Sequence, residues 1–489
     1  MNINNISTLG ELKKAKYQSR TIKEELRANL IEVLKEGKTV FEGIHGYENT
    51  VIPDLERAIL AGHNINFLGL RGQAKTRLAR MMTALLDEYI PYIDGTEIND
   101  DPLNPISKQG LSLIEEHGDA TPIAWLHRDD RYFEKLATPD VSVADLIGDV
   151  DPIKAANLKL PYSDERTLHF GMIPRAHRCI FVINELPDLQ ARIQVALFNI
   201  LQEGDIQIRG FKLRLPLDLQ FVFTANPEDY TNRGSIVTPL KDRIGSQILT
   251  HYPKDIATAA KITKQEARLN AEQLNKVEIP DLAYVLLEQI AFEARENEFI
   301  DAKSGVSTRL TISALENLVS TAERRALIDG AKNTTLRLND FMGIIPAITG
   351  KVELVYEGEQ EGAGIVAENL IGTAVKSLLP EYYPSLDKLK SGDEGNPYHE
   401  LIKWFGQGNN VDLLFQANDK EYRQALEECE PLQKFLAKHQ ASLAKSERYF
   451  HMEMVLWALA EHAKLNKEKI EEGFNFADLF SSYLRGGEI

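Results

Sequence analysis

The feature that most limits how this chain can fold is a short glycine-containing loop between an apolar run and a helical pattern. The apolar run is Ile65–Leu68, the loop Gly-Leu-Arg-Gly-Gln-Ala occupies 69–74, and Lys75-Thr76 precedes a helical pattern at 77–86. A buried strand, a loop and a helix in this order indicate α/β architecture. Backbone N–H groups of such a loop and the helix N-terminus attract phosphate oxygens, and a lysine adds positive charge. The sequence therefore predicts a phosphate-binding loop within an α/β domain.

The stretch 69–76 resembles a Walker A loop. In that pattern Lys75 reaches the β and γ oxygens of a nucleotide, and the Thr76 hydroxyl binds Mg²⁺. The pattern has glycine before the lysine, and here Ala74 takes that position. Because alanine adds a Cβ and disfavours positive φ, the substitution is expected to weaken nucleotide binding.

A second motif follows in the order that a nucleotide site needs. Cys179–Asn184 is a mostly apolar run that precedes Glu185, and it resembles a Walker B strand in which Asn184 replaces the first acid. At the end of a buried strand, Glu185 would accept a proton from the attacking water, and Asn184 would contact a magnesium-bound water without contributing charge. The alternative is that Glu185 is a structural carboxylate.

The rest of the chain divides by pattern. Further strands are expected at 180–183 and 219–224, and no strands are expected beyond Pro253. Amphipathic stretches predict helices at 257–274, 282–295, 310–326 and 338–348. The segment 388–397, which contains the run SGDEGNP at 391–397, indicates a linker. The segment after it is expected to be helical, with Phe450, Met454 and Trp457 in its core.

Four domains are predicted from these changes of pattern: an N-terminal helical arm at 1–40, an α/β nucleotide-binding core at 41–255, a helical lid at 256–387 and a C-terminal helical domain at 388–489. The arm contains leucines and isoleucines at helical spacing, so we expect it to pack against the core. Its small excess of basic residues leaves open a second interpretation, an arm that docks onto an acidic partner.

Composition excludes several classes of function. Two cysteines cannot form a disulfide framework, and a net charge of −17 opposes binding to a phosphate backbone. The sequence shows neither a signal peptide at its start nor an apolar run long enough to cross a membrane. We therefore expect a cytoplasmic protein with no nucleic-acid and no membrane partner.

Taken together, the motifs resemble those of AAA+ ATPases, and within that class the magnesium-chelatase ATPase subunit and the MoxR-like group. The segment 41–48 (FEGIHGYE) is similar to the one that precedes the first strand in this group, and 170–178 (FGMIPRAHR) is similar to the insert before Walker B. The segment 223–228 (FTANPE) looks like the end of the sensor-1 strand. The segment 240–245 (LKDRIG) resembles the box that carries the arginine finger, with Ile244 in the aromatic position.

This resemblance implies a fold and a set of site residues. The implied fold is an AAA+ P-loop core with a central parallel sheet, followed by a helical lid. The implied catalytic residues are Glu185, Asn226, Arg243 as the finger acting on a neighbouring subunit, and Arg309 as sensor 2. The implied nucleotide ligands are His45, Gly46, Gly69, Arg71, Gly72, Gln73, Ala74, Lys75, Thr76 and Arg77, and the implied magnesium ligands are Thr76 and Asn184.

Two of these residues have alternative roles. Arg243 could form an ion pair within its own subunit, and Arg309 could cap the helix that follows it.

The resemblance also implies an activity, which is ATP hydrolysis with Mg²⁺. A finger that acts on a neighbour requires a homo-oligomeric ring, most often a hexamer. The expected partner is a protein with a von Willebrand factor A-type domain, which the ring would remodel in metal insertion or complex maturation.

Three alternatives remain at this point. The chain could be a genuine magnesium chelatase ATPase subunit, or a scaffold that binds nucleotide without hydrolysing it, given Ala74 and Asn184. A related transcription activator would need a DNA-binding module, for which the sequence gives no signal.

Overall fold

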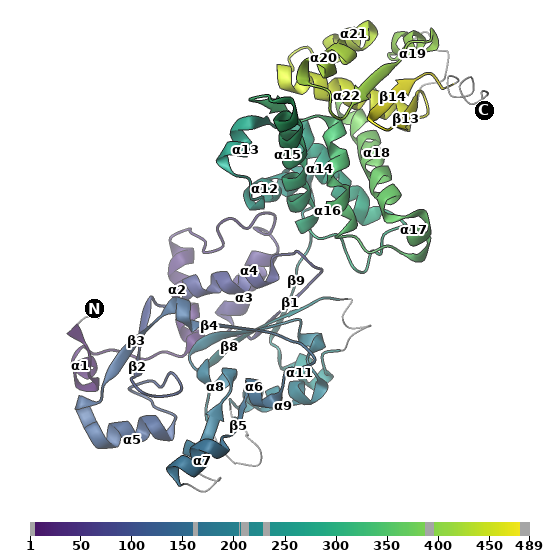
Figure 1. Cartoon of the computed structure of the whole chain (residues 1–489). Helices are drawn as coiled ribbons and strands as arrows, with labels where there is room; N and C mark the ends of the chain where they lie inside the picture. Colours follow the sequence, from purple (N-terminus) through teal and green to yellow (C-terminus); the bar gives the residue numbers. More distant parts are fainter. Residues whose placement is uncertain are drawn as a thin grey trace. The chain divides into compact units, whose positions relative to one another are not determined.

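The computed structural model describes residues 5–159, 165–204, 206, 215–227, 235–386 and 396–479. The chain divides into two compact units, Met1–His251 and Tyr252–Ile489, and each is described by itself (Figure 1). Neither unit has, among its described helices, one that combines the length and the apolar character needed to span a bilayer.

The centre of the first unit is a five-stranded sheet in which every pair of neighbours is parallel. Its strands, in spatial order, are β4 (Tyr132–Leu136), β7 (Cys179–Asn184), β8 (Leu219–Ala225), β1 (Ile65–Leu68) and β9 (Ser246–Leu249). All residues of β7 and β8 are buried, as expected for parallel strands covered on both faces. The strands predicted at 65–68, 180–183 and 219–224 are thus confirmed.

Helices cover both faces of this sheet. Side chains alternate along a strand, so Ile180 and Val182 belong to one apolar cluster, whereas Phe181 and Ile183 belong to another. The first cluster includes residues of α2 (Ile22–Lys35), α3 (Val51–Leu60) and α4 (Lys75–Met81). The second includes residues of α8 (Met172–Arg175), α9 (Ala191–Glu203) and α11 (Thr238–Arg243).

The N-terminal arm forms two helices that pack against the first unit. In α2, Ile22, Leu26 and Leu30 are buried in the same cluster as β1. The preceding helix α1 (Leu9–Lys14) places Leu12 against Ile123. The leucines and isoleucines at helical spacing in the arm are therefore the residues that pack against the first unit.

Two antiparallel strand pairs were not predicted. One pairs β2 (Tyr89–Ile93) with β3 (Ile123–His127), and α5 (Lys108–His117) lies between these strands in the chain. The other pairs β5 (Gly148–Val150) with β6 (Leu168–Phe170), and α7 (Pro152–Leu158) lies between them in the chain. Pro91 in β2 argues against a strand in sequence, but a strand with one partner tolerates proline. The strands β5 and β6 have only three residues each, which is too few to show a period.

The second unit is mostly helical. Its main helices are α12 (Ile256–Glu266), α13 (Ala271–Lys276), α14 (Asp281–Glu296), α15 (Arg309–Asp329), α16 (Ile345–Thr349), α17 (Tyr356–Glu361) and α18 (Ala363–Tyr382). The helices predicted at 282–295 and 310–326 are confirmed. The stretch 257–274 is two helices, because Ala267 turns to an extended conformation and Asn270 caps a new helix. The stretch 338–348 begins as a 3₁₀ helix, Leu338–Ile344, and continues as α16.

The prediction of an entirely helical segment beyond Pro253 was wrong. Two short strands, β10 (Val277–Glu278) and β11 (Thr334–Thr335), pair in parallel, and a three-stranded antiparallel sheet contains β12 (Val411–Leu414), β14 (Gly473–Ala477) and β13 (Asn466–Ile470). The charged side chains of β13 hide its strand character, which depends on pairing with β14. Most of the linker predicted at 388–397 lies outside the described residues.

The C-terminal part of the second unit also contains α19 (His399–Gly406), α20 (Asp419–Glu427), α21 (Glu430–His439) and α22 (Lys445–Glu461). In α22, Phe450, Met454 and Trp457 are buried, which confirms the core interpretation of this stripe. One apolar cluster includes residues from Val277 to Phe476.

An ion cluster joins the two halves of this unit. Arg325 of α15 lies 2.9 Å from Asp340 and 3.1 Å from Asp419, and Arg337 lies 2.6 Å from Asp419. Burial alone raises the pKa of Asp419, but the hydrogen bond and charge of Arg337 lower the pKa overall. The carboxylate of Asp419 is therefore held ionised against Arg325 and Arg337.

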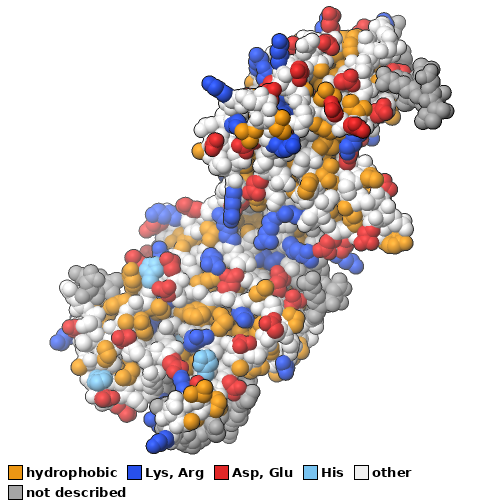
Figure 2. All heavy atoms as spheres, in the orientation of Figure 1, with side chains coloured by type: hydrophobic (Ala, Val, Ile, Leu, Met, Phe, Trp, Pro, Cys, Tyr) orange, Lys and Arg blue, Asp and Glu red, His pale blue; other side chains and the backbone are white. Residues whose placement is uncertain are grey.

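Charged side chains are mixed on the surface. On the face drawn in Figure 2, acidic and basic side chains are interspersed on each unit. Acidic side chains therefore do not gather in one block on this face.

Candidate active site

The predicted site residues follow the carboxyl ends of neighbouring parallel strands. The loop 69–74 follows β1, Glu185 follows β7, and Asn226 follows β8, which lies between the other two. Because parallel strands end at the same edge of a sheet, this order places Asn226 between the loop and Glu185.

Direct contacts join these three positions. Lys75 Nζ donates to Asn226 Oδ1 at 2.7 Å, and Asn226 Nδ2 donates to Glu185 Oε2 at 2.8 Å. Lys75 and Asn226 are buried, with 8% and 4% of their surface exposed. The structure thus brings together a lysine, an amide and a carboxylate that are up to 151 positions apart in sequence.

The backbone of the loop is shaped by close packing and positive φ. A Cβ at Gly69 would lie 2.0 Å from Thr250 Oγ1, so a larger residue at this position would displace the side chain of Thr250. Gly72 has a φ of +74°. Lys75 Nζ also donates to the carbonyl oxygens of Gly69 and Leu70, the latter at 2.9 Å. The lysine is therefore held over the loop by backbone oxygens.

Other loop residues have distinct positions. Gln73 is buried, and its Oε1 accepts a hydrogen bond from Thr250 Oγ1 at 2.7 Å. Thr250 directly follows β9, so this bond connects the loop to the end of that strand. Arg71 and Arg77 are exposed. Their roles as nucleotide ligands stay predictions.

Ala74 adopts the left-handed conformation, with φ 55° and ψ 17°. Alanine disfavours this positive φ, as noted from the sequence. An L-residue pays about 1–2 kcal/mol in this region, whereas glycine does not. Glycine loses more chain entropy on folding, which offsets part of this difference.

Ala74→Gly is therefore expected to stabilise the protein by about 0.5–1 kcal/mol and to strengthen nucleotide binding. Urea unfolding of the two proteins measures the first effect. Ala79→Gly, in the interior of α4, is the matched control and should destabilise by about 1 kcal/mol. If Ala74→Gly lowered the free energy of unfolding as much as Ala79→Gly, the inference that Ala74 is strained would be contradicted.

A second network surrounds Asn184. Its Oδ1 accepts hydrogen bonds from Thr76 Oγ1 and Thr224 Oγ1, both at 3.2 Å, and its Nδ2 donates to Glu134 Oε1 at 2.6 Å. The two predicted magnesium ligands, Thr76 and Asn184, are thus in contact. Glu134 was missed in the sequence, because only strand pairing brings β4 beside β7.

Glu185 lies at a strained backbone position. Its φ is 55° and its ψ is 50°, and its backbone N–H donates to Thr224 Oγ1 at 3.1 Å. Non-glycine residues held in this region concentrate at functional sites, where the surrounding structure enforces the geometry. The conformation directs the side chain of Glu185 toward Asn226 rather than into the strand's continuation.

The segment 41–48 lies beside the loop. Tyr47 is buried, and its hydroxyl lies 3.1 Å from the carbonyl oxygen of Gln73 and 2.8 Å from that of His251. The preceding Gly46 has a φ of +82°, and His45 is partly exposed. The structure thus places His45 and Gly46 next to a residue that touches the loop, and their contact with nucleotide stays a prediction.

The insert residue His177 is structural. It is buried, and its Nδ1 accepts the backbone N–H of Asp218 at 3.1 Å. Burial and the neighbouring Arg178 lower the pKa of His177 to about 3, so the ring is neutral at physiological pH.

The two predicted arginines are not among these contacts. Arg243, at the end of α11, donates from Nε to Gln202 Oε1 at 2.9 Å and from Nη1 to the carbonyl oxygen of Pro239 at 2.7 Å. Within the described residues it makes hydrogen bonds but no ion pair. Arg309 is exposed at the start of α15, in the second unit. The roles of both stay predictions.

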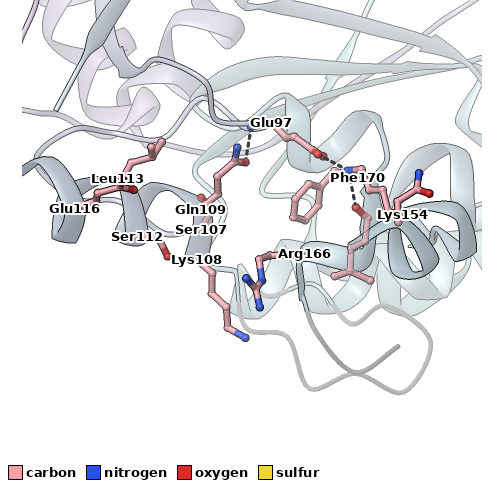
Figure 3. A pocket seen from close by; sticks show the side chains of 12 residues that line it. Glu97, Ser107, Lys108, Gln109, Ser112, Leu113, Glu116, Lys154, Arg166 and Phe170 are labelled. Atoms are coloured by element: carbon pink, nitrogen blue, oxygen red, sulfur yellow. Dashed lines mark hydrogen bonds and ion pairs between the residues drawn. The ribbon is translucent and has the colours of Figure 1, made fainter. Parts of the chain in front are cut away.

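A separate cavity of about 580 Å³ lies in the first unit, between α5, α7 and β6 (Figure 3). Lys154 there forms an ion pair with Glu97 and donates to the carbonyl oxygen of Leu168 at 3.2 Å. None of the predicted site residues lines this cavity. The candidate active site is therefore the strand-end network and not this cavity.

The network provides oxygen ligands suited to Mg²⁺. The Thr76 hydroxyl and the Asn184 amide oxygen are adjacent, and magnesium in nucleotide sites is bound by few protein groups together with substrate phosphates. Within the part of the chain that is described, no group of three or more His, Cys, Asp or Glu side chains could hold a metal ion alone. The residues fit a metal that arrives with a nucleotide.

No protein-family model matches the chain. A candidate ATPase from Cytophaga hutchinsonii is 18% identical at a TM-score of 0.30, over 74% of this chain and 97% of that one. The complex of the BchI and BchD subunits of magnesium chelatase gives 19% identity and a TM-score of 0.35, over 65% and 97%. NtrX from Brucella abortus in complex with ATP is 14% identical at a TM-score of 0.37, over 82% of this chain and 72% of that one. Similarity at this level assigns no role to any residue.

The fold follows from the chain's own topology. The strand β1, the loop 69–74 and helix α4 follow one another directly, and β1 lies inside a parallel sheet covered by helices on both faces. The fold-class prediction is confirmed: the chain has an α/β P-loop core followed by mostly helical domains, the fold implied by its resemblance to AAA+ ATPases of the magnesium-chelatase and MoxR-like group.

Proposed function

We propose that the chain is a Mg²⁺-dependent ATPase of the AAA+ type. The observation that carries this proposal is the hydrogen-bonded series from Lys75 through Asn226 to Glu185, beside the contact of Thr76 with Asn184. A phosphate-binding lysine and a candidate base are thus joined through a single amide.

Each side chain has a role that its chemistry supports. Lys75 would exchange its contact with Asn226 for the β and γ oxygens of ATP, since an ammonium prefers an anionic acceptor. Glu185 would accept the proton of the attacking water, and the Asn226 amide would orient that water. Thr76 and Asn184 would hold Mg²⁺, which when bound neutralises charge on the phosphates.

The assembly and the partner are further parts of the proposal. Arg243 would complete the site of a neighbouring subunit, because a guanidinium offers a fixed fork of donors to the transferred phosphoryl group. This role requires a homo-oligomeric ring, proposed to be a hexamer. The work of hydrolysis would remodel a protein with a von Willebrand factor A-type domain, in metal insertion or complex maturation.

The second candidate function is a scaffold that binds nucleotide without turnover. Two observations favour it: Ala74 is strained in the loop, and Asn184 brings no charge to the magnesium side. A genuine magnesium chelatase ATPase subunit would share the mechanism proposed above and differ in its client.

Phosphate release at steady state separates the motor from the scaffold. The motor releases phosphate from ATP and Mg²⁺ well above the rate of the Glu185→Gln variant. Equal rates for the two proteins, with nucleotide bound to both, would support the scaffold and overturn the motor.

A further inference from the structure

Glu134 lies beside the position where the Walker B pattern has lost its first acid. It belongs to β4, the strand that pairs with β7, and Leu136 of β4 is the register partner of Asn184. The Glu134 side chain is 27% exposed, and Asn184 is 9% exposed. A partly buried carboxylate thus stands one hydrogen bond from the amide that replaces the acid.

The contacts fix which way the Asn184 amide faces. A carboxylate only accepts hydrogen bonds, so the group 2.6 Å from Glu134 Oε1 must be the amide nitrogen. Thr224 Oγ1 accepts the backbone N–H of Glu185 and uses its own proton toward Asn184. The amide oxygen of Asn184 therefore faces Thr76, as a magnesium-side group requires.

Glu134 is itself held from the phosphate-loop helix. Its Oε2 accepts from Arg80 Nη2 at 2.6 Å, and the Arg80 guanidinium lies 4.6 Å from the centre of the Tyr132 ring. Arg80 is 65% exposed, so solvent screens its charge and the ion pair only partly offsets the charge of the carboxylate. Negative charge thus remains next to Asn184.

We propose that Glu134 supplies, from the neighbouring strand, both the negative charge and the orienting contact that position 184 lacks, and so acts as a positioning residue for Mg²⁺. The inference rests on the proposed function, because it concerns the metal that accompanies the nucleotide. Groups that orient metal ligands in this way typically change metal affinity about 10–100-fold.

The test is the Mg²⁺ dependence of nucleotide binding, measured with a fluorescent ATP analogue and repeated with Mn²⁺ by electron paramagnetic resonance. Glu134→Gln keeps the size of the side chain and removes its charge. We expect apparent metal affinity to fall about 10-fold or more, while nucleotide binding in EDTA stays within about twofold. Glu88→Gln makes the same change of charge at an exposed position and should bind metal like the wild type.

Asn184→Asp provides the second arm. In the Glu134→Gln background, Asn184→Asp restores one carboxylate among the two contacting residues 134 and 184, so the apparent metal affinity should recover toward the wild-type value.

Each result decides. A Glu134→Gln protein with wild-type metal affinity would overturn the inference alone. Loss in Glu134→Gln without recovery in the double variant would mean a role in local structure only, and would also overturn it. A wild-type protein whose nucleotide binding does not respond to Mg²⁺ would overturn both the inference and the proposed function.

Discussion

Glu185→Gln is expected to lower the rate of ATP hydrolysis about 100-fold or more, because a positioned general base typically contributes about 10²–10⁴. Glutamine retains the size of the side chain and can still accept the hydrogen bond from Asn226 Nδ2. It cannot take a proton from water. Nucleotide binding should therefore persist, since Lys75, Thr76 and the loop are unchanged.

Single-turnover hydrolysis measured with excess protein isolates this step from product release. Binding of the same nucleotide, measured on the same preparation, shows whether the site is intact. Glu88→Gln is again the matched control and should hydrolyse ATP at the wild-type rate. A Glu185→Gln variant that turns over as fast as the wild type would remove Glu185 from the mechanism.

Arg243→Ala is expected to lower turnover by about 10³-fold or more, the range that arginine fingers contribute. Arg243 donates hydrogen bonds to the neutral oxygens of Gln202 and Pro239, which are weaker acceptors than a phosphate. Lys241→Ala removes an exposed cation from the same helix and should have little effect.

Mixing of variants tests whether Arg243 acts on a neighbour. Lys75→Ala subunits cannot use nucleotide but still carry Arg243, and Arg243→Ala subunits have the converse defect. A mixture of the two should recover part of the activity that each lacks, because mixed interfaces contain one complete site. No recovery in mixed assemblies would contradict a role across subunits.

The sequence predicted the core because its signals are local. The strand β1 has the predicted bounds, since it is a compact apolar run next to clear turn residues. The order of the motifs was also readable, because each motif combines a strand end with a residue of defined chemistry.

The remaining features depend on contacts between distant segments. The strand β13 becomes a strand through its pairing with β14, and its own residues are polar and charged. Glu134 contacts Asn184 only because β4 pairs with β7, 50 positions away. Strand pairing is set by the whole fold, so neither feature has a signal within a short window.

The left-handed conformation of Ala74 was predictable from sequence only in part. The sequence identified Ala74 as an unfavourable residue, and the structure shows that the loop retains the conformation in spite of it. The positive φ of Glu185 had no such signal, because no motif position there calls for glycine.

Calorimetric titration of ATP with Mg²⁺ tests most directly whether Lys75, Thr76 and Glu185 surround one triphosphate. The account predicts saturable heat for the wild-type protein with no more than one nucleotide per chain, retention of that heat in Glu185→Gln, and its loss in Lys75→Ala. Absence of heat in the wild-type protein, or wild-type binding in Lys75→Ala, would contradict the account.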